Sequence, residues 1–115
     1  MKEALGTIQV DNDVIAKVAG SVAIATSGIV GMAMLNIKSG IWEILRRENL
    51  TKGVRVSRTY EDKIILTFNV IVAYGTNIAT VADNLIENVQ YQVERFTGME
   101  IEKINIIVES VRVRD

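Results

Sequence analysis

Cysteine, histidine and proline are absent from this sequence of 115 residues, and aromatic residues make up only 5% of it. Without cysteine, the chain has no disulfide framework, no thiolate nucleophile and no cysteine metal site, which fits a reducing cytoplasm. Without histidine, it lacks the commonest general base and the commonest transition-metal ligand, so Ser-His and Cys-His mechanisms are excluded. Catalysis would depend on carboxylates or lysines alone, and we expect neither an enzyme nor a bound cofactor.

The net charge of the sequence is also small. The 13 basic and 14 acidic residues leave a formal charge of −1. Because the two signs are mixed along the chain, no bulk field draws the molecule to nucleic acid or to anionic lipid. The longest weakly polar stretch, Gly28 to Ile37, has about half of the roughly 20 residues that a spanning helix needs, and the first residues show no secretory signal. We therefore expect a cytoplasmic protein without a membrane span.

Two helices are predicted from apolar residues that recur at spacings of three and four. The first begins near the capping residues "DND" at 11–13 and stops at Gly28. The second follows "YGTN" at 74–77 and ends at Gly98. Between the first helix and residue 50, three glycines and flexible apolar residues predict an irregular segment, with a short helix in "IWEILRREN".

Strands are predicted where apolar residues alternate with polar ones. A short strand covers 5–10, and a second covers 54–60. The turn "EDK" joins that second strand to the strongest one, at 64–74, in an antiparallel hairpin. The last strand, after Gly98, changes parity, and a bulge near Glu109 and Ser110 would restore its apolar residues to one face.

These elements define the predicted fold class. With 49% hydrophobic and 23% charged residues, the chain suits one domain covering residues 1–115. The order is strand, helix, irregular segment, strand, strand, helix, strand. It predicts a two-layer α+β sandwich, in which a mixed or antiparallel sheet of about four strands carries two long helices on one face.

The break at Gly75, Thr76 and Asn77 allows two interpretations. A phosphate-binding loop needs several glycines and usually a terminal lysine, whereas this segment has one glycine and no lysine. A structural joint needs a glycine for the reversal and a side chain, here Thr76 or Asn77, that caps the next helix. We therefore interpret the segment as a joint between a strand and a helix.

The segment from Gly28 to Leu45 is more apolar than a loop requires. Methionine side chains adapt to irregular partner surfaces, so this segment is a candidate contact surface. The alternative is that the segment folds back over the domain's own core, and the sequence does not decide between them. The candidate contact residues are Met32, Met34, Leu35, Ile37, Ile41 and Trp42.

Charged clusters give weaker signals. Asp11 and Asp13 suit a helix start, and Glu61 and Asp62 suit a turn, so neither acidic pair predicts a metal site. The basic residues would supply phosphate contacts in an alternative function, a small nucleic-acid-binding domain, but acidic neighbours dilute them and nucleic acid is disfavoured. These basic residues are Arg46, Arg47, Lys52, Arg55 and Arg58.

The order of several short motifs resembles the alkaline shock protein family, also called the Gls general-stress family. The motifs are "GIVGM" after the first helix, "KGV" at 52–54, "YG" with "NI" at 74–78, and "TG" with the alternating strand at 97–108. The resemblance extends over nearly the whole chain.

The resemblance implies a small cytoplasmic α+β protein linked to envelope stress or homeostasis, without an established catalytic activity. It also implies self-association into a homo-oligomer and, in some members, a place near the membrane through a membrane-anchored protein partner. Long charged terminal extensions are common in the family, and this chain has almost none. We therefore do not expect it to have functions that reside in such extensions.

Overall fold

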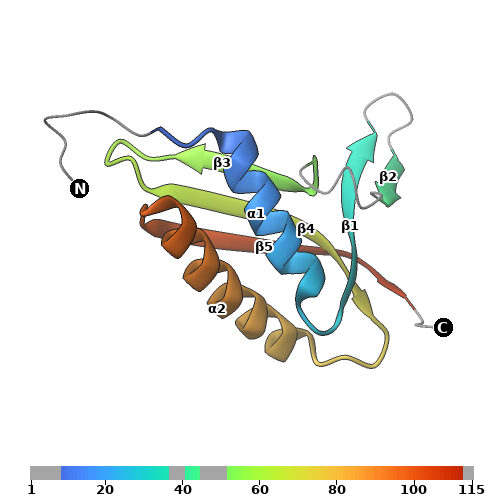
Figure 1. Ribbon diagram of the computed structural model, residues 1–115. Coiled ribbons are helices and arrows are strands. Elements are labelled where there is room, and N and C mark those ends of the chain that lie inside the picture. The colour runs from blue at the N-terminus through green and yellow to red at the C-terminus, as the bar shows by residue number, and fades with distance from the viewer. Residues whose placement is uncertain (1–8, 37–40, 45–51, 113–115) are drawn as a thin grey trace, which may run out of the picture.

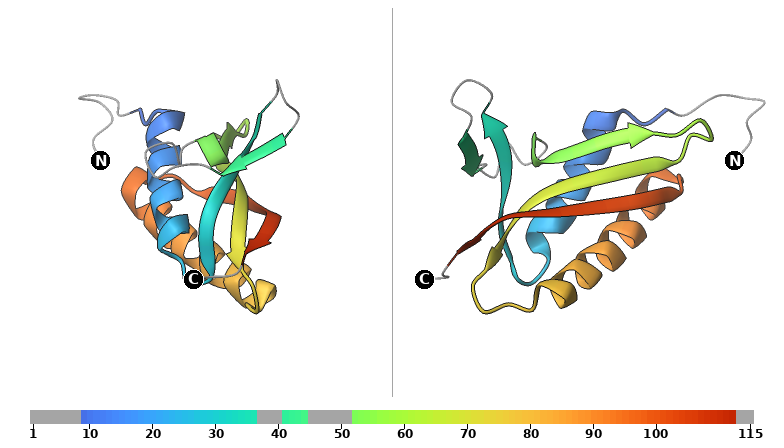
Figure 2. Two further views of the ribbon diagram at one scale, coloured as in Figure 1. Left: turned by 90° about the vertical axis from the view of Figure 1, so that its right-hand side faces the viewer. Right: turned by 180° about the vertical axis from the view of Figure 1, so that it is seen from behind.

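Two helices and five strands make up the part of the chain that the computed structural model describes, which is residues 9–36, 41–44 and 52–112 (Figure 1). Both helices lie on one face of the sheet, as the end-on view in Figure 2 shows. The predicted two-layer α+β class is therefore confirmed. The elements are α1 (Asn12–Ala25), β1 (Ile29–Asn36), β2 (Ile41–Ile44), β3 (Val54–Arg58), β4 (Ile64–Ala73), α2 (Ile78–Thr97) and β5 (Ile101–Arg112).

Strand β4 is the centre of a mixed sheet. On one side it pairs with β5 in parallel, from Ile64 to Ala73. It also pairs antiparallel with β3 through its first half, residues 64–68, and with β1 through residues 70–72. The parallel pair β4–β5 is joined through α2, because parallel neighbours need a long crossover whereas antiparallel ones need only a turn.

The core lies between β4 and the two helices. Every second side chain of β4 is 0–1% exposed, as the alternation in its sequence predicts: Ile64, Leu66, Phe68, Val70 and Val72. Helix α2 contributes branched residues to the same core, namely Val81, Leu85, Val89 and Val93, and α1 contributes Ile15 with a row of alanines, Ala16, Ala19 and Ala23. The small residues of α1 allow it to lie close to its neighbours.

The segment expected to be irregular is instead two antiparallel strands, and this prediction was wrong. β1 pairs with β2, with Leu35 opposite Trp42 and Asn36 opposite Ile41. Glycines and methionines have little strand preference of their own, but the edge of β4 provides hydrogen-bonding partners for β1. The short helix predicted from residue 41 is replaced by β2 at its start, and its later residues lie outside the described part of the chain.

The first predicted strand also differs from the structure. Residues 1–8 lie outside the described part, and Gln9 and Val10 precede α1 without forming a strand. The order of the described elements is therefore helix, four strands, helix, strand. The antiparallel hairpin of β3 and β4 is confirmed, and Thr59 Oγ1 accepts hydrogen bonds from the backbone N–H groups of Glu61 and Lys63 in its turn.

The predicted bulge in β5 is confirmed at Glu109. Val70 of β4 lies opposite Val108, and Ile71 lies opposite Ser110, so Glu109 is the extra residue. A second register shift, between Ile64 and Ile65, leaves Glu102 as an extra residue near the start of β5. The intervening residues, 103–108, pair with β4 in a regular register.

Candidate interaction surfaces

The joint between β4 and α2 has the geometry of a turn followed by a capped helix. Gly75 has a φ of +84°, which a glycine adopts without steric cost. Asn77 is the N-cap, and its Oδ1 accepts a hydrogen bond from the backbone N–H of Thr80 at 3.1 Å. Of the two residues that the sequence left open, Asn77 is the one that caps. The chain contributes one glycine and one amide side chain here, which is what a strand-to-helix joint requires.

The hairpin of β1 and β2 extends past the rest of the sheet. Only the first part of β1, Ile29 to Met32, pairs with β4, whereas Ala33 to Asn36 pair with β2. In Figure 1 this distal part of β1 rises away from the two helices together with β2. We call the paired backbone of 33–36 and 41–44 the distal hairpin.

The candidate contact residues divide between two places. Met32 is 0% exposed and belongs to the core, so for this residue the segment folds back on its own domain. Met34, Leu35, Ile41 and Trp42 belong to the distal hairpin. Ile37 lies outside the described residues. Four of the six therefore come from two adjacent strands, instead of from a loop and a helix.

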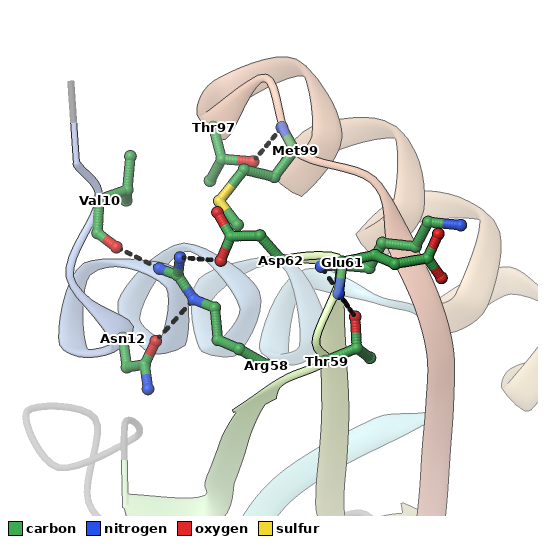
Figure 3. Close-up of polar contacts among 9 residues, drawn as sticks. Val10, Asn12, Arg58, Thr59, Glu61, Asp62, Thr97 and Met99 are labelled. Carbon is green, nitrogen blue, oxygen red and sulfur yellow. Dashed lines mark hydrogen bonds and ion pairs between the residues drawn. The ribbon is translucent and has the colours of Figure 1, made fainter. Parts of the chain in front are cut away.

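Arg58 joins the start of α1 to the turn between β3 and β4 (Figure 3). Its Nε donates to Asn12 Oδ1 at 3.2 Å, its Nη1 donates to Asp62 Oδ1 at 3.1 Å, and its Nη2 donates to the carbonyl oxygen of Val10. A guanidinium presents its donors in a fixed planar fork, so these three acceptors fix its orientation. Arg58 therefore has a structural role, which sequence spacing could not reveal because two of its partners are 46 and 48 residues away.

The two arginines of β3 do not lie on the same face of the sheet. Arg55 is opposite Thr67 in the hairpin, whereas Arg58 is opposite Ile64, which faces the helices. Because successive side chains of a strand alternate between faces, Arg55 and Arg58 lie on opposite sides of the sheet. Arg58 is also paired with Asp62. Lys52 is exposed, and Arg46 and Arg47 lie outside the described residues. Within the described residues, the separation of Arg55 from Arg58 gives the nucleic-acid alternative no support.

Two carboxylates near the start of β5, those of Glu94 and Glu100, make polar contacts with neighbouring elements. Glu94 Oε2 accepts a hydrogen bond from the backbone N–H of Ile101 at 2.8 Å and so ties α2 to the start of β5. Glu100 Oε2 lies 3.0 Å from Lys63 Nζ, and this hydrogen bond and charge raise the pKa of Lys63 above its ordinary value, with Glu61 adding to the effect. No group of three acidic residues within the described ranges is arranged to hold a metal ion.

The sequence alone did not identify the outer face of the sheet or the edge of β5 as surfaces. The helices cover one face, and the outer face carries Ile65, Thr67 and Asn69 of β4 beside Lys103, Asn105 and Ile107 of β5. The Nδ2 of Asn105 donates to Thr67 Oγ1 at 3.3 Å across the two strands. Ile107 is 45% exposed. The sequence pattern of β5 could have indicated this surface. Its isoleucines lie on both faces of the strand, so some of them must lie on the face that the helices do not cover.

Helices of the described residues offer no candidate for crossing a membrane, since none is both long and apolar enough.

Comparison with known proteins gives one family and two curated relatives. The family model that matches residues 1–113 is named after alkaline shock protein 23, so it is the model of the alkaline shock protein family, and it is described as having a cell envelope-related function. The protein YloU of Bacillus subtilis strain 168, described as uncharacterized, is 44% identical over 114 residues, which cover 98% of this chain and 94% of YloU. The protein Spy1614 of Streptococcus pyogenes serotype M6, also described as uncharacterized, is 35% identical over 109 residues, covering 94% of this chain and 89% of Spy1614. No solved structure matches.

Proposed function

This chain belongs to the alkaline shock protein family, and from that premise we propose that it is a non-enzymatic protein of envelope stress or homeostasis that acts through self-association and protein–protein contacts. The family match over residues 1–113 confirms the resemblance drawn from the motifs and supports a role related to the cell envelope. The proposed location is the cytoplasm, near the membrane, where a membrane-anchored protein partner would hold it.

The distal hairpin is the observation that carries this proposal. Its backbone pairs outside the central sheet, and its sequence supplies Met34, Leu35, Ile41 and Trp42. A projecting pair of strands rich in apolar and aromatic residue types is typical of contact surfaces, where tryptophan and methionine are enriched. The absence of histidine and cysteine from the sequence supports a function that does not depend on nucleophilic catalysis.

The proposal is tested by replacing Met34 and Trp42 with serine, singly and together, and measuring the mass in solution by light scattering. The control is Tyr60→Ser, because Tyr60 is fully exposed in the turn between β3 and β4, far along the chain from the hairpin. We expect the average mass to fall in the hairpin variants, with unchanged circular dichroism, and to stay unchanged in the control. If the variant with both Met34 and Trp42 replaced has the same oligomer size as the unmodified protein, the proposal is overturned.

A further inference from the structure

Strand β5 is a long edge strand. It has 12 residues and pairs with β4 on one side, and no described strand lies on its other side. The view of the sheet from behind in Figure 2 shows β5 at the margin of the sheet, next to β4. An edge strand presents a row of backbone N–H and C=O groups, which pair readily with a strand from another chain.

The apolar residues of β5 that face the helices are incompletely buried. Ile104, Ile106 and Val108 are only partly buried against the core, whereas their register neighbours in β4, Leu66, Phe68 and Val70, are all 0% exposed. On the outer face, Ile107 is 45% exposed. A further strand along the edge of β5 would remove apolar surface from water on both faces, which is favourable in proportion to the area buried.

Charges near the two ends of the regular part of β5 are of opposite sign. Lys103 is exposed and forms no ion pair with a described residue. Glu109, the bulge residue, has a buried Oε2 that accepts no hydrogen bond from the described part of the chain. The residue as a whole is only partly buried, so a positive charge from another copy can approach its carboxylate, and such a charge would stabilise it.

We propose that two copies of this chain pair through β5, antiparallel about a two-fold axis at Ile106, so that their sheets join into one. In this register Lys103 of one copy lies opposite Glu109 of the other, and the symmetry forms the pair twice. The proposal rests on the self-association proposed above and adds to it a second surface, distinct from the distal hairpin. Directly opposed residues of an antiparallel pair are close enough for opposite charges to attract.

The charge pattern selects this register over its neighbours. Directly opposed residues share a face of the sheet, so the neighbouring registers move the axis by a whole residue; with the axis at Asn105, Lys103 lies opposite Ile107 and not opposite a carboxylate. With the axis at Ile107, Glu109 lies opposite Asn105, and Lys103 again has no carboxylate opposite it. A lysine on an edge strand commonly prevents pairing. Here the carboxylate of Glu109 neutralises the charge of Lys103 only in the proposed register. Lys103 therefore favours this register and disfavours the others.

The test is a charge-reversal cycle on the full chain, with the dissociation constant of the dimer measured by analytical ultracentrifugation. Lys103→Glu alone and Glu109→Lys alone each place like charges opposite one another at both symmetric contacts. Each change should weaken the dimer roughly tenfold. Combining Lys103→Glu with Glu109→Lys restores opposite charges and should return the dissociation constant to within roughly threefold of the unmodified protein. The control is Lys17→Glu, an exposed charge on α1.

A second measurement needs no variant and so does not depend on folding of the mutants. Hydrogen exchange of the unmodified protein is followed over a range of concentrations, and the amides of β5 should become protected as concentration rises. Unchanged exchange in β5 overturns the pairing, as does a double reversal as weak as the single ones.

The two proposals fail in different ways. If the hairpin variants dissociate the protein but the charge reversals have no effect, self-association stands and the pairing through β5 is overturned. If the unmodified chain has the mass of one chain at every concentration, both are overturned.

Discussion

The two helices cover the same face of the sheet, yet their ends are held in different ways. Helix α2 is capped by residues adjacent to it in sequence. The side chain of Asn77 accepts a hydrogen bond from the backbone N–H of Thr80, and Gly98 has the left-handed conformation, with a φ of 71°. Helix α1 has Asp11 at its N-cap without a side-chain hydrogen bond, and its C-cap residue, Thr26, has an extended backbone. The start of α1 is held instead by Arg58, from β3.

The difference shows where the information for each helix resides. The boundaries of α2 follow from residues within one or two turns of its ends, and its buried residues are branched. The position of α1 depends on residues far along the chain, and apart from Ile15 its buried face consists of alanine and glycine. Helix α1 therefore depends on close packing and tertiary hydrogen bonds, whereas α2 depends on its own caps and large apolar side chains.

The largest expected effect is on the packing of α2. Leu85 is 0% exposed, and Leu85→Ala should lower the free energy of unfolding by about 2–5 kcal/mol, because it removes apolar contacts and leaves a cavity. The matched change Ile78→Ala, at a residue on α2 that is 46% exposed, should cost less than about 1 kcal/mol. Urea unfolding measures both. Equal losses would contradict the placement of the Leu85 side chain in the core.

The next prediction compares the turn after α1 with the turn before α2. Gly28 has a φ of +95°, and a Cβ there would lie 2.5 Å from Val81 Cγ2 and 2.9 Å from Thr76 Cγ2. Gly28→Ala therefore combines backbone strain with overpacking, and should cost roughly 2–4 kcal/mol. At Gly75, φ is +84° and a Cβ would meet nothing within 4 Å. Gly75→Ala should therefore cost only about 1–2 kcal/mol of strain.

Thermal unfolding of the two alanine variants measures this difference. A larger loss of stability for Gly75→Ala than for Gly28→Ala would contradict the close packing of Gly28 against Val81 and Thr76.

Removing Arg58 should loosen α1 selectively. Arg58→Met keeps much of the apolar stem but loses the donors to Asn12 and Val10, and we expect a loss of about 1–3 kcal/mol. Hydrogen exchange should accelerate at the first amides of α1 and stay unchanged in α2. The control is Arg55→Met, on the opposite face of β3. Equal acceleration in both helices would contradict a local role for Arg58.

The smallest expected effect concerns the two N-caps. Asn77→Ala removes a hydrogen bond at the start of α2 and should cost about 1 kcal/mol. Asp11 makes no side-chain cap hydrogen bond, so Asp11→Ala removes only a favourable charge near the start of α1. This change should lower the free energy of unfolding by roughly a few tenths of a kcal/mol. Chemical denaturation of both variants in low salt makes the comparison, and a larger loss at Asp11 would reverse it.

Sequence reasoning was accurate where local chemistry decides the structure. It found the start of α2, the glycine that ends it, the alternating core of β4 and the bulge at Glu109, because capping, left-handed glycine and strand alternation act over a few residues. It left the sheet as mixed or antiparallel. A strand, a helix and a strand in succession could have indicated the parallel pairing of β4 with β5.

Other features depend on residues that are distant in sequence. Strand β1 was missed because its glycine and methionines favour no element, and pairing with the edge of β4 decides its conformation. Strand β2 was predicted as the start of a short helix, and its pairing with β1 decides its conformation. The three acceptors of Arg58 were not predictable together, since two of them, on Asn12 and Val10, are 46 and 48 residues away in the sequence. Of the candidate contact residues, the burial of Met32 follows from the same pairing, since Met32 lies opposite Val70.

The most direct test of the account is the mass of the unmodified chain in solution as a function of concentration, measured by sedimentation velocity. Self-association through the surfaces described above predicts that the mass rises from one chain to a dimer or larger assembly as concentration increases. A sample that sediments as a single chain over the whole range would contradict a function based on self-association.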